Sequence, residues 1–167
     1  VLREGGNAVD AAIAAYLTAW VAEPCMTSGG GGGFALVFSA ERGEARLFDG
    51  FCQTPGRKRP AREQEFVPIE VDFGGNREVF QAGLGAAAVP GAVALVFSLH
   101  ERYGTRPLRE LARPAIEAAR GGVLIDDFQY LNFQLLEPIL RMRPESGPLF
   151  FPGDKLIGPG ERMRMPG

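Results

Sequence analysis

The sequence predicts a fold that mixes helices with strands, and three observations indicate this. Residues 9–20 carry apolar side chains at the spacing of a helix. Residues 34–49 contain two apolar segments joined by a short polar turn, which is typical of a β-hairpin. From residue 91 onward, helical patterns recur between glycines and prolines. We therefore expect an opening helix, a pair of strands and a mainly helical second half.

The first helix is expected to begin after Asn7. Asn7 is a good N-cap, and Asp10 places a negative charge in the positively polarised first turn. The side chains expected to face the core are Val9, Ile13, Tyr16 and Trp20. Alanines are frequent between residues 8 and 15, which makes one face of the helix thin and favours close packing on a sheet.

Five consecutive glycines, residues 29–33, run directly into the first strand. Glycine loses more conformational freedom on folding than any other residue, so such a run weakens a fold unless something requires it. A phosphate-binding P-loop needs Lys and then Ser or Thr at the start of a helix, whereas here Phe34 and a strand follow. We predict instead that this backbone lies against another backbone or a substrate, where any Cβ would collide.

The strands are expected at residues 34–38 and 44–49. The first of them is apolar on both faces, which predicts an interior position. Residues 54–68 are charged, contain prolines and lack periodicity, so we expect a loop there. Residues 69–73 alternate as a strand should.

A second glycine pattern offers a different function. Gly83, Gly85 and Ala88 satisfy the dinucleotide-binding pattern G-x-G-x-x-A, with a short apolar run before them and helical sequence after. That apolar run is short, however, and Pro90 places the helix start later than a pyrophosphate needs. A non-catalytic or nucleotide-binding module that uses the Gly83–Ala88 turn is therefore the alternative interpretation.

The second half should contain several helices. Pro90 suits the first position of a helix that Gly104 closes. Pro114 is expected to break the next helical stretch, and Asp126 can cap a last helix. The apolar face of that last helix is predicted to consist of Phe128, Leu131, Leu135 and Ile139. The remainder, residues 151–167, is rich in turn-forming residues.

Composition excludes several functional classes. The chain has 167 residues, 46% of them apolar, and a net charge of -2, which is the profile of an ordinary soluble protein without a nucleic-acid-binding surface. No apolar run is long enough to cross a membrane and no signal segment is visible, so the compartment stays open between cytoplasm and periplasm. Cys25, Cys52 and His100 are too few for a metal site or a disulfide framework, and no cofactor is expected. No repeat or linker divides the chain, which predicts a single domain.

Several motifs together resemble the opening of the large subunit of gamma-glutamyltranspeptidases. They are VLREGGNAVDAAIAA, EP followed by GGGGGFALVF, and LFDG with TP shortly after. The likeness continues through AAVPGAVALVFSLHERYGTRPLRELARPAIEAARGG and LFFPGDKLIGPGERMRMPG. The resemblance implies an α+β fold, a four-layer αββα N-terminal-nucleophile hydrolase sandwich, in which residues 1–167 are a single-domain fragment from the N-terminal part of the large subunit.

The same resemblance implies a precursor that cleaves itself into two subunits. In that family the Thr freed at the start of the small subunit is the nucleophile, and its own α-amine is the base. The threonines of this chain are all internal, so we assign no catalytic residue to it. The expected partners are a small subunit that carries the nucleophile and a small-molecule amide or γ-glutamyl-like substrate.

The large subunit of the family contributes an arginine in a D-x-R-E-x-A-P-like motif, which pairs with the α-carboxylate of the substrate. This chain reads DGFCQTP, so Phe51 stands at the arginine position, with Cys52 at the glutamate and Gln53 next to it. An apolar ring cannot neutralise a carboxylate. We therefore hypothesise a substrate other than a standard γ-glutamyl compound such as glutathione.

The role of Phe51 has alternatives. The ring could line a pocket for a larger acyl group, or it could fill core space where the arginine would stand. Arg57, in an Arg-Lys-Arg run, could supply the missing positive charge, although a solvated loop is the simpler interpretation of that run. For Cys52, Cys25 and His100 we favour packing or surface roles over reactivity.

Overall fold

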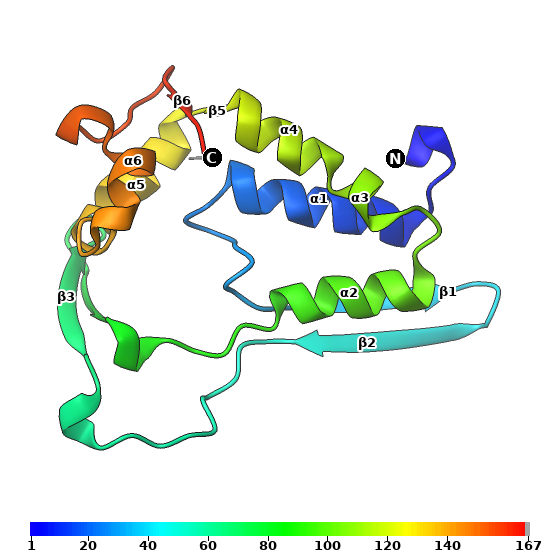
Figure 1. Ribbon diagram of the computed structural model, residues 1–167, viewed down its shortest axis with the longest axis horizontal. Coiled ribbons are helices and arrows are strands. Elements are labelled where there is room, and N and C mark those ends of the chain that lie inside the picture. Colours follow the sequence, from blue (N-terminus) through cyan, green and yellow to red (C-terminus); the bar gives the residue numbers. More distant parts are fainter. Residues whose placement is uncertain (166–167) are drawn as a thin grey trace. The chain divides into compact units, whose positions relative to one another are not determined.

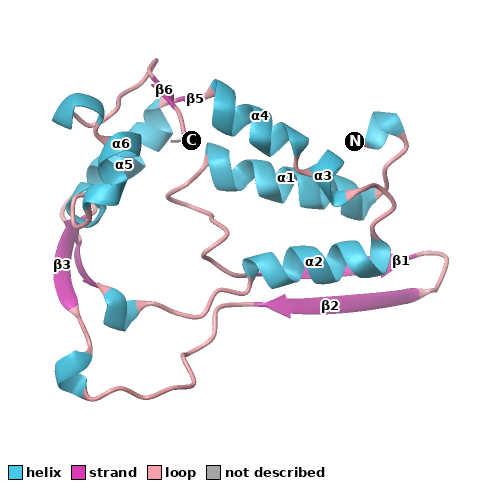
Figure 2. Cartoon of the chain, in the orientation of Figure 1, coloured by secondary structure: helices cyan, strands magenta, loops and turns pink. Residues whose placement is uncertain are grey.

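The structure is a computed structural model that describes residues 1–165, and the chain forms two compact units. Unit 1 comprises Val1–Thr54 and Ala88–Ala119, and unit 2 comprises Pro55–Ala87 and the residues from Arg120 onward. Both units combine helices with antiparallel strands, as Figures 1 and 2 show. Two of the turn-rich residues at the end of the chain, 166–167, lie outside the described residues.

Unit 1 contains one strand pair and most of the helices. Its elements are α1 (Ala8–Ala22), β1 (Gly33–Ser39), β2 (Glu44–Gly50), α2 (Ala92–Tyr103), α3 (Leu108–Leu111) and α4 (Arg113–Gly121, which runs past the unit boundary). The expected hairpin is confirmed, because β1 and β2 pair antiparallel from Gly33 opposite Gly50 to Ser39 opposite Glu44. Pro114 lies at the second position of α4, directly after the break at Ala112.

The start of α1 has the predicted cap, and its Asp10 carboxylate also accepts hydrogen bonds from a distant segment. The Asn7 side chain accepts a hydrogen bond from the Asp10 amide, and the Asp10 carboxylate accepts one from the Asn7 amide, each at 2.9 Å. The buried Asp10 carboxylate also accepts hydrogen bonds from the Thr105 amide and hydroxyl and from the Arg106 amide. Asp10 therefore joins the first turn of α1 to the segment that follows α2.

The core of unit 1 lies on one face of the hairpin. Figure 1 shows α2 running along β1 and β2. The buried members of the cluster come from α1, α2 and α3 and are Ile13, Ala14, Leu95, Val96, Leu99 and Leu111. The hairpin contributes Ala35, Val37 and Phe48, and α1 contributes Tyr16 and Trp20, which pack against this cluster while half-buried.

The opposite face of the hairpin is apolar and uncovered in the described chain. Antiparallel register places Phe34, Leu36, Phe38 and Leu47 on one face, and all four side chains are exposed. The expectation of an interior first strand is thus met on one side only, because residues 1–165 supply one covering layer. We call Phe34, Leu36, Phe38 and Leu47 the open face.

Unit 2 contains two further strand pairs and a long helix. Its elements are β3 (Val67–Asp72), β4 (Arg77–Ala82), β5 (Val123–Leu124), α5 (Asp127–Leu140), α6 (Gly147–Phe150) and β6 (Arg162–Met163). β3 pairs with β4 and β5 with β6, both antiparallel. The strand β4 was not expected from its sequence, since nearly all of its side chains are exposed and no apolar periodicity marks it.

Two details of the helices differ from the predictions. Asp126 caps α5 as expected, but the buried side chains of this helix are Gln129 and Phe133, while Phe128 and Leu131 of the predicted apolar face are exposed. The spacing of apolar residues identifies an apolar side of the helix, but it does not tell which side packs against the rest of the unit. In addition, α2 begins at Ala92 with Gly91 as its N-cap, two residues later than Pro90 suggested.

The Gly83–Ala88 turn is not a dinucleotide-binding turn. It leads into a single 3-10 turn, Leu84–Ala86, and then into extended backbone. The Gly85 amide donates to the Glu65 carbonyl oxygen (2.8 Å), and the Leu84 amide donates to the Glu65 carboxylate (3.1 Å). Because a pyrophosphate needs free amides at the start of a helix that directly follows a parallel strand, the nucleotide-binding interpretation of this turn is wrong.

Candidate functional site

The glycine run lies where three backbone segments meet. A Cβ on Gly32 would lie 2.6 Å from the Cys52 nitrogen and 2.8 Å from the Gly50 carbonyl oxygen. The amides of Gly91 and Ala92, at the start of α2, both donate to the Gly31 carbonyl oxygen, at 3.1 and 3.0 Å. The predicted close approach of backbones is therefore confirmed.

A second glycine contact closes the same junction from the side of α2. A Cβ on Gly91 would collide with the Gly50 carbonyl oxygen and would lie 2.8 Å from the Phe51 carbonyl oxygen. Gly50 itself is buried, and a Cβ there would lie 2.6 Å from the Cβ of Leu95. The end of β2 is thus held between the glycine run and α2, and this fixes the backbone position of residue 51.

Phe51 follows immediately and places its ring beside the open face. The Phe51 amide donates to a carboxylate oxygen of Asp49 (2.9 Å), which turns the chain at the end of β2. The ring stacks on that of Phe34, with centroids 5.4 Å apart and an angle of 11° between the planes. Both rings remain accessible, with exposed fractions of 54% for Phe51 and 59% for Phe34. A pure core-filling role for Phe51 is not realised within the described chain.

The other predicted site residues differ in their surroundings. Cys52 is half-buried beside Gly32. Gln53 is exposed and forms a two-way backbone bridge with Val89, at 3.0 and 2.8 Å, so its backbone is fixed while its side chain is accessible. Arg57 is exposed in the loop that opens unit 2, and it takes part in no ion pair within residues 1–165. The structure therefore brings Phe51, Cys52 and Gln53 together on one short segment.

Two further residues, which the sequence analysis did not assign to the site, complete it. Phe34 supplies the stacking partner of Phe51, and Asp49 supplies the carboxylate that fixes the turn. Phe34 could have been identified from the period of the strands, because it pairs with Asp49 across the hairpin. Directly paired residues lie on the same face of a sheet, which places Phe34 beside the turn that carries Phe51. The parallel orientation of the two rings depends on the turn and could not have been predicted from the sequence.

The remaining polar candidates have structural partners. The Thr18 hydroxyl donates to the Ala14 carbonyl oxygen (2.7 Å), as helix-internal threonines do. His100 Nε2 lies 2.7 Å from the Arg106 carbonyl oxygen, next to the end of α2. Burial, followed by the nearby charge of Glu23, raises the pKa of the Cys25 thiol to about 11, so this thiol is protonated at neutral pH. The surroundings of His100 and Cys25 agree with the packing or surface roles expected for them from the sequence.

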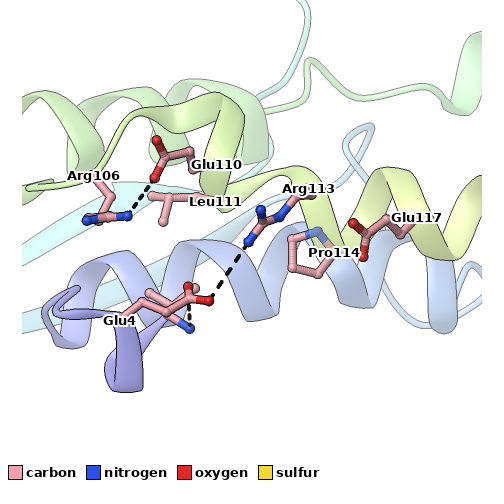
Figure 3. A pocket seen from close by; sticks show the side chains of 8 residues that line it. Glu4, Arg106, Glu110, Leu111, Arg113, Pro114 and Glu117 are labelled. Carbon is pink, nitrogen blue, oxygen red and sulfur yellow. Dashed lines mark hydrogen bonds and ion pairs between the residues drawn. The ribbon is translucent and has the colours of Figure 1, made fainter.

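A separate cavity of about 170 Å³ lies in unit 1, and Figure 3 shows it from close by. Charged side chains dominate its lining, and they pair with each other: Arg106 with Glu110 at 2.8 Å, and Arg113 with Glu4 at 4.0 Å. The lining contains no hydroxyl or thiol side chain. The cavity could therefore bind a polar group, but it supplies no nucleophile.

No group of three metal-ligating side chains occurs in residues 1–165, and no helix in that range is long and apolar enough to span a bilayer.

A sequence profile described as gamma-glutamyltranspeptidase matches residues 1–167. The chain belongs to the gamma-glutamyltranspeptidase family. It is 31% identical over 169 residues to "Acylase ACY 1 proenzyme" of Pseudomonas sp. (strain SE83), covering 98% of this chain and 29% of that protein. It is 34% identical over 129 residues to "Glutathione hydrolase proenzyme" of Escherichia coli (strain K12), covering 76% of this chain and 21% of that protein.

The solved structures give the same family. The crystal structure of Helicobacter pylori gamma-glutamyltranspeptidase superimposes with a TM-score of 0.82 at 31% identity, covering 99% of this chain and 46% of that chain. The expected membership and the α+β class are therefore confirmed. The gamma-glutamyltranspeptidase-like chain spans less than a third of the two curated relatives, and their names describe enzymes made as proenzymes.

Proposed function

We propose that the full-length protein is a self-processed amide hydrolase or acyltransferase whose nucleophile lies outside residues 1–167. The observation that carries this proposal is the family match along the whole chain, with relatives that are proenzymes of an acylase and a glutathione hydrolase. The two units described above would both belong to one large-subunit domain. The Thr nucleophile would begin a small subunit that packs against it.

The proposed reaction is acyl transfer through an ester. The hydroxyl oxygen of the small-subunit Thr attacks the amide carbonyl, and its proton moves to the α-amine of the same Thr. The C–N bond then breaks, and the departing amine takes up that proton. Water, or a second amine, attacks the ester carbonyl, releases the acyl group and restores the hydroxyl. Residues 1–167 would contribute to binding the acyl group.

The open face supports an assembly with more chain. Four large apolar side chains on one side of a two-stranded sheet form a patch of the kind that marks an interface. A second sheet laid on this patch would give the two central layers of the expected αββα sandwich. We propose that the rest of the polypeptide, including the small subunit, supplies that sheet over Leu36, Phe38 and Leu47, and that the Phe34 end of the patch stays open beside Phe51.

The site supports a substrate that differs from glutathione. Phe51 stands where the family motif has its carboxylate-binding arginine, and its backbone is held by Gly32, Gly91 and Asp49. Among the four predicted site residues, Arg57 is the one cation, and it could replace the arginine. One relative carries the name acylase, which does not specify a γ-glutamyl substrate.

Expression of the full-length gene tests both the proposed self-processing enzyme and the proposed substrate. Self-cleavage should give two fragments on a denaturing gel, and sequencing of the smaller fragment should return Thr as its first residue. An intact chain without amidase activity would remove the enzymatic proposal. Efficient glutathione cleavage by the processed protein would instead remove the substrate proposal, and loss of that cleavage in Arg57→Ala would assign the carboxylate contact to Arg57.

A further inference from the structure

The Phe34–Phe51 pair differs from the other ring pairs of the described chain. Its planes are nearly parallel, at 11°. The other pairs within residues 1–165 are tilted or edge-on, with interplanar angles from 47° to 77°. Edge-on pairs such as Phe133 with Phe150 interlock inside a core, whereas two offset parallel rings leave flat surface free. We call Phe34 and Phe51 the aromatic platform.

The platform itself carries no charge, and one anion belongs to the same turn. Asp49 lies opposite Phe34 in the hairpin and is exposed, and one of its carboxylate oxygens holds the Phe51 amide. Among the ion pairs and cation–ring contacts within residues 1–165, none includes Asp49 or either ring. A carboxylate placed on the platform would lose water, gain no counter-charge from either ring and be repelled by Asp49.

We infer that the acyl group of the natural substrate presents a flat apolar group, an aryl ring, to the aromatic platform. The inference rests on the proposed function and names the substrate class of the same site. An aryl ring stacked on Phe51 gains offset-ring contact and buries apolar surface on both partners. Phe51 is thus a substrate-binding residue, and Phe34 supports its ring from behind.

The test uses the self-processed full-length protein and three p-nitroanilides that differ in the acyl group: phenylacetyl, butanoyl and γ-glutamyl. Butanoyl lacks both the ring and the α-carboxylate, so it separates a preference for aryl groups from simple rejection of a carboxylate. We expect kcat/KM to be about tenfold higher for phenylacetyl than for butanoyl, the fold-change that one good ring contact supplies. The γ-glutamyl substrate should be the slowest of the three.

Matched variants locate the effect. Phe51→Ala should reduce the phenylacetyl-to-butanoyl ratio about tenfold, mainly through KM. Phe38→Ala is the control, because Phe38 is the same residue type, exposed on the same open face, at the turn end of the hairpin. It should leave the ratio unchanged even where it lowers stability, since misfolding reduces turnover of both substrates equally. Phe51→Arg should raise γ-glutamyl turnover and lower phenylacetyl turnover.

In the kinetic assay, two outcomes overturn the inference: equal kcat/KM for phenylacetyl and butanoyl in the wild-type protein, or equal changes of the ratio in Phe51→Ala and Phe38→Ala. Calorimetric binding of phenylacetamide and butanamide gives a readout without turnover. A protein that cleaves none of the anilides but binds phenylacetamide more tightly, and loses that preference in Phe51→Ala, removes the proposed function and leaves the aryl site standing. Equal binding of the two amides removes the aryl site.

Discussion

Substitution of Gly32 by Ala tests the backbone junction that positions the site. The added Cβ would lie 2.6 Å from the Cys52 nitrogen, 2.8 Å from the Gly50 carbonyl oxygen and 2.9 Å from the Phe51 carbonyl carbon. Ordinary contacts between such atoms begin at about 3.5 Å, so β2 would have to move by close to one ångström. All three neighbours are backbone atoms, which no rotamer change can withdraw. We expect Gly32→Ala to lower the free energy of unfolding by about 3 kcal/mol, the upper range for overpacking.

Gly30→Ala is the matched control within the same run. Its Cβ would meet only the Ser28 hydroxyl oxygen, at 3.6 Å, and neither Gly30 nor Gly32 has a positive φ. Alanine should therefore stabilise the protein by about 0.5 kcal/mol through the unfolded chain. Urea unfolding of full-length protein, followed by circular dichroism, measures both changes. Equal shifts in the two variants would refute the reasoning, because chain entropy alone would then account for the run.

Further predictions concern buried groups and a helix cap. Asp10→Asn should lower the free energy of unfolding by about 3 kcal/mol, since the buried charge accepts several hydrogen bonds, and urea unfolding at pH 7 measures it. Burial alone would raise the pKa of Asp10, but hydrogen bonds from Thr105, Asn7 and Arg106 hold it below the usual 3.8. The stability that the charged carboxylate contributes is therefore complete above pH 3.8 and is lost as pH falls through the lower pKa of the folded state. The unfolding free energies of wild type and Asp10→Asn should consequently converge in acid titrations. In a Cys52→Ser background, Cys25 should react with iodoacetamide at pH 8 about a hundredfold more slowly in folded than in urea-unfolded protein, because its pKa is raised to about 11; comparable rates would contradict this. Asp126→Ala should cost about 1 kcal/mol by removing the cap of α5, measured by the same unfolding assay.

Local signals in the sequence predicted much of the fold. Asn7 and Asp126 were identified as caps because a side-chain oxygen before a helical pattern satisfies amides that the helix leaves free, and both form complete capping boxes. The β1–β2 hairpin followed from two apolar segments around a polar turn. The close approach at Gly32 followed from elimination, since a phosphate loop would need a helix after the glycines.

The features that the sequence did not predict are set by contacts between elements, which decide which surface of each element is covered. The apolar stripe of α5 has the right period, yet Phe133 is buried and Phe128 is exposed, because packing within unit 2 selects another side of the helix. Likewise, β4 shows no apolar alternation, since its strand state comes from pairing with β3. The partnership of Phe34 with Phe51 joins residues distant in sequence through the hairpin register and the Asp49 turn, neither of which a motif encodes.

The position of residue 51 and the chemistry of its side chain have separate physical origins. Its backbone is fixed by the Asp49 carboxylate, by the Gln53–Val89 bridge and by glycine contacts, and none of these involves the side chain at 51. The side chain itself is more than half exposed, so its replacement leaves no cavity in the core of unit 1. A guanidinium and a phenyl ring can therefore occupy the same place on the same scaffold. If an arginine there attracts a carboxylate and a phenylalanine stacked on Phe34 attracts an apolar ring, we expect this one exchange to redirect specificity while the junction that presents residue 51 stays intact.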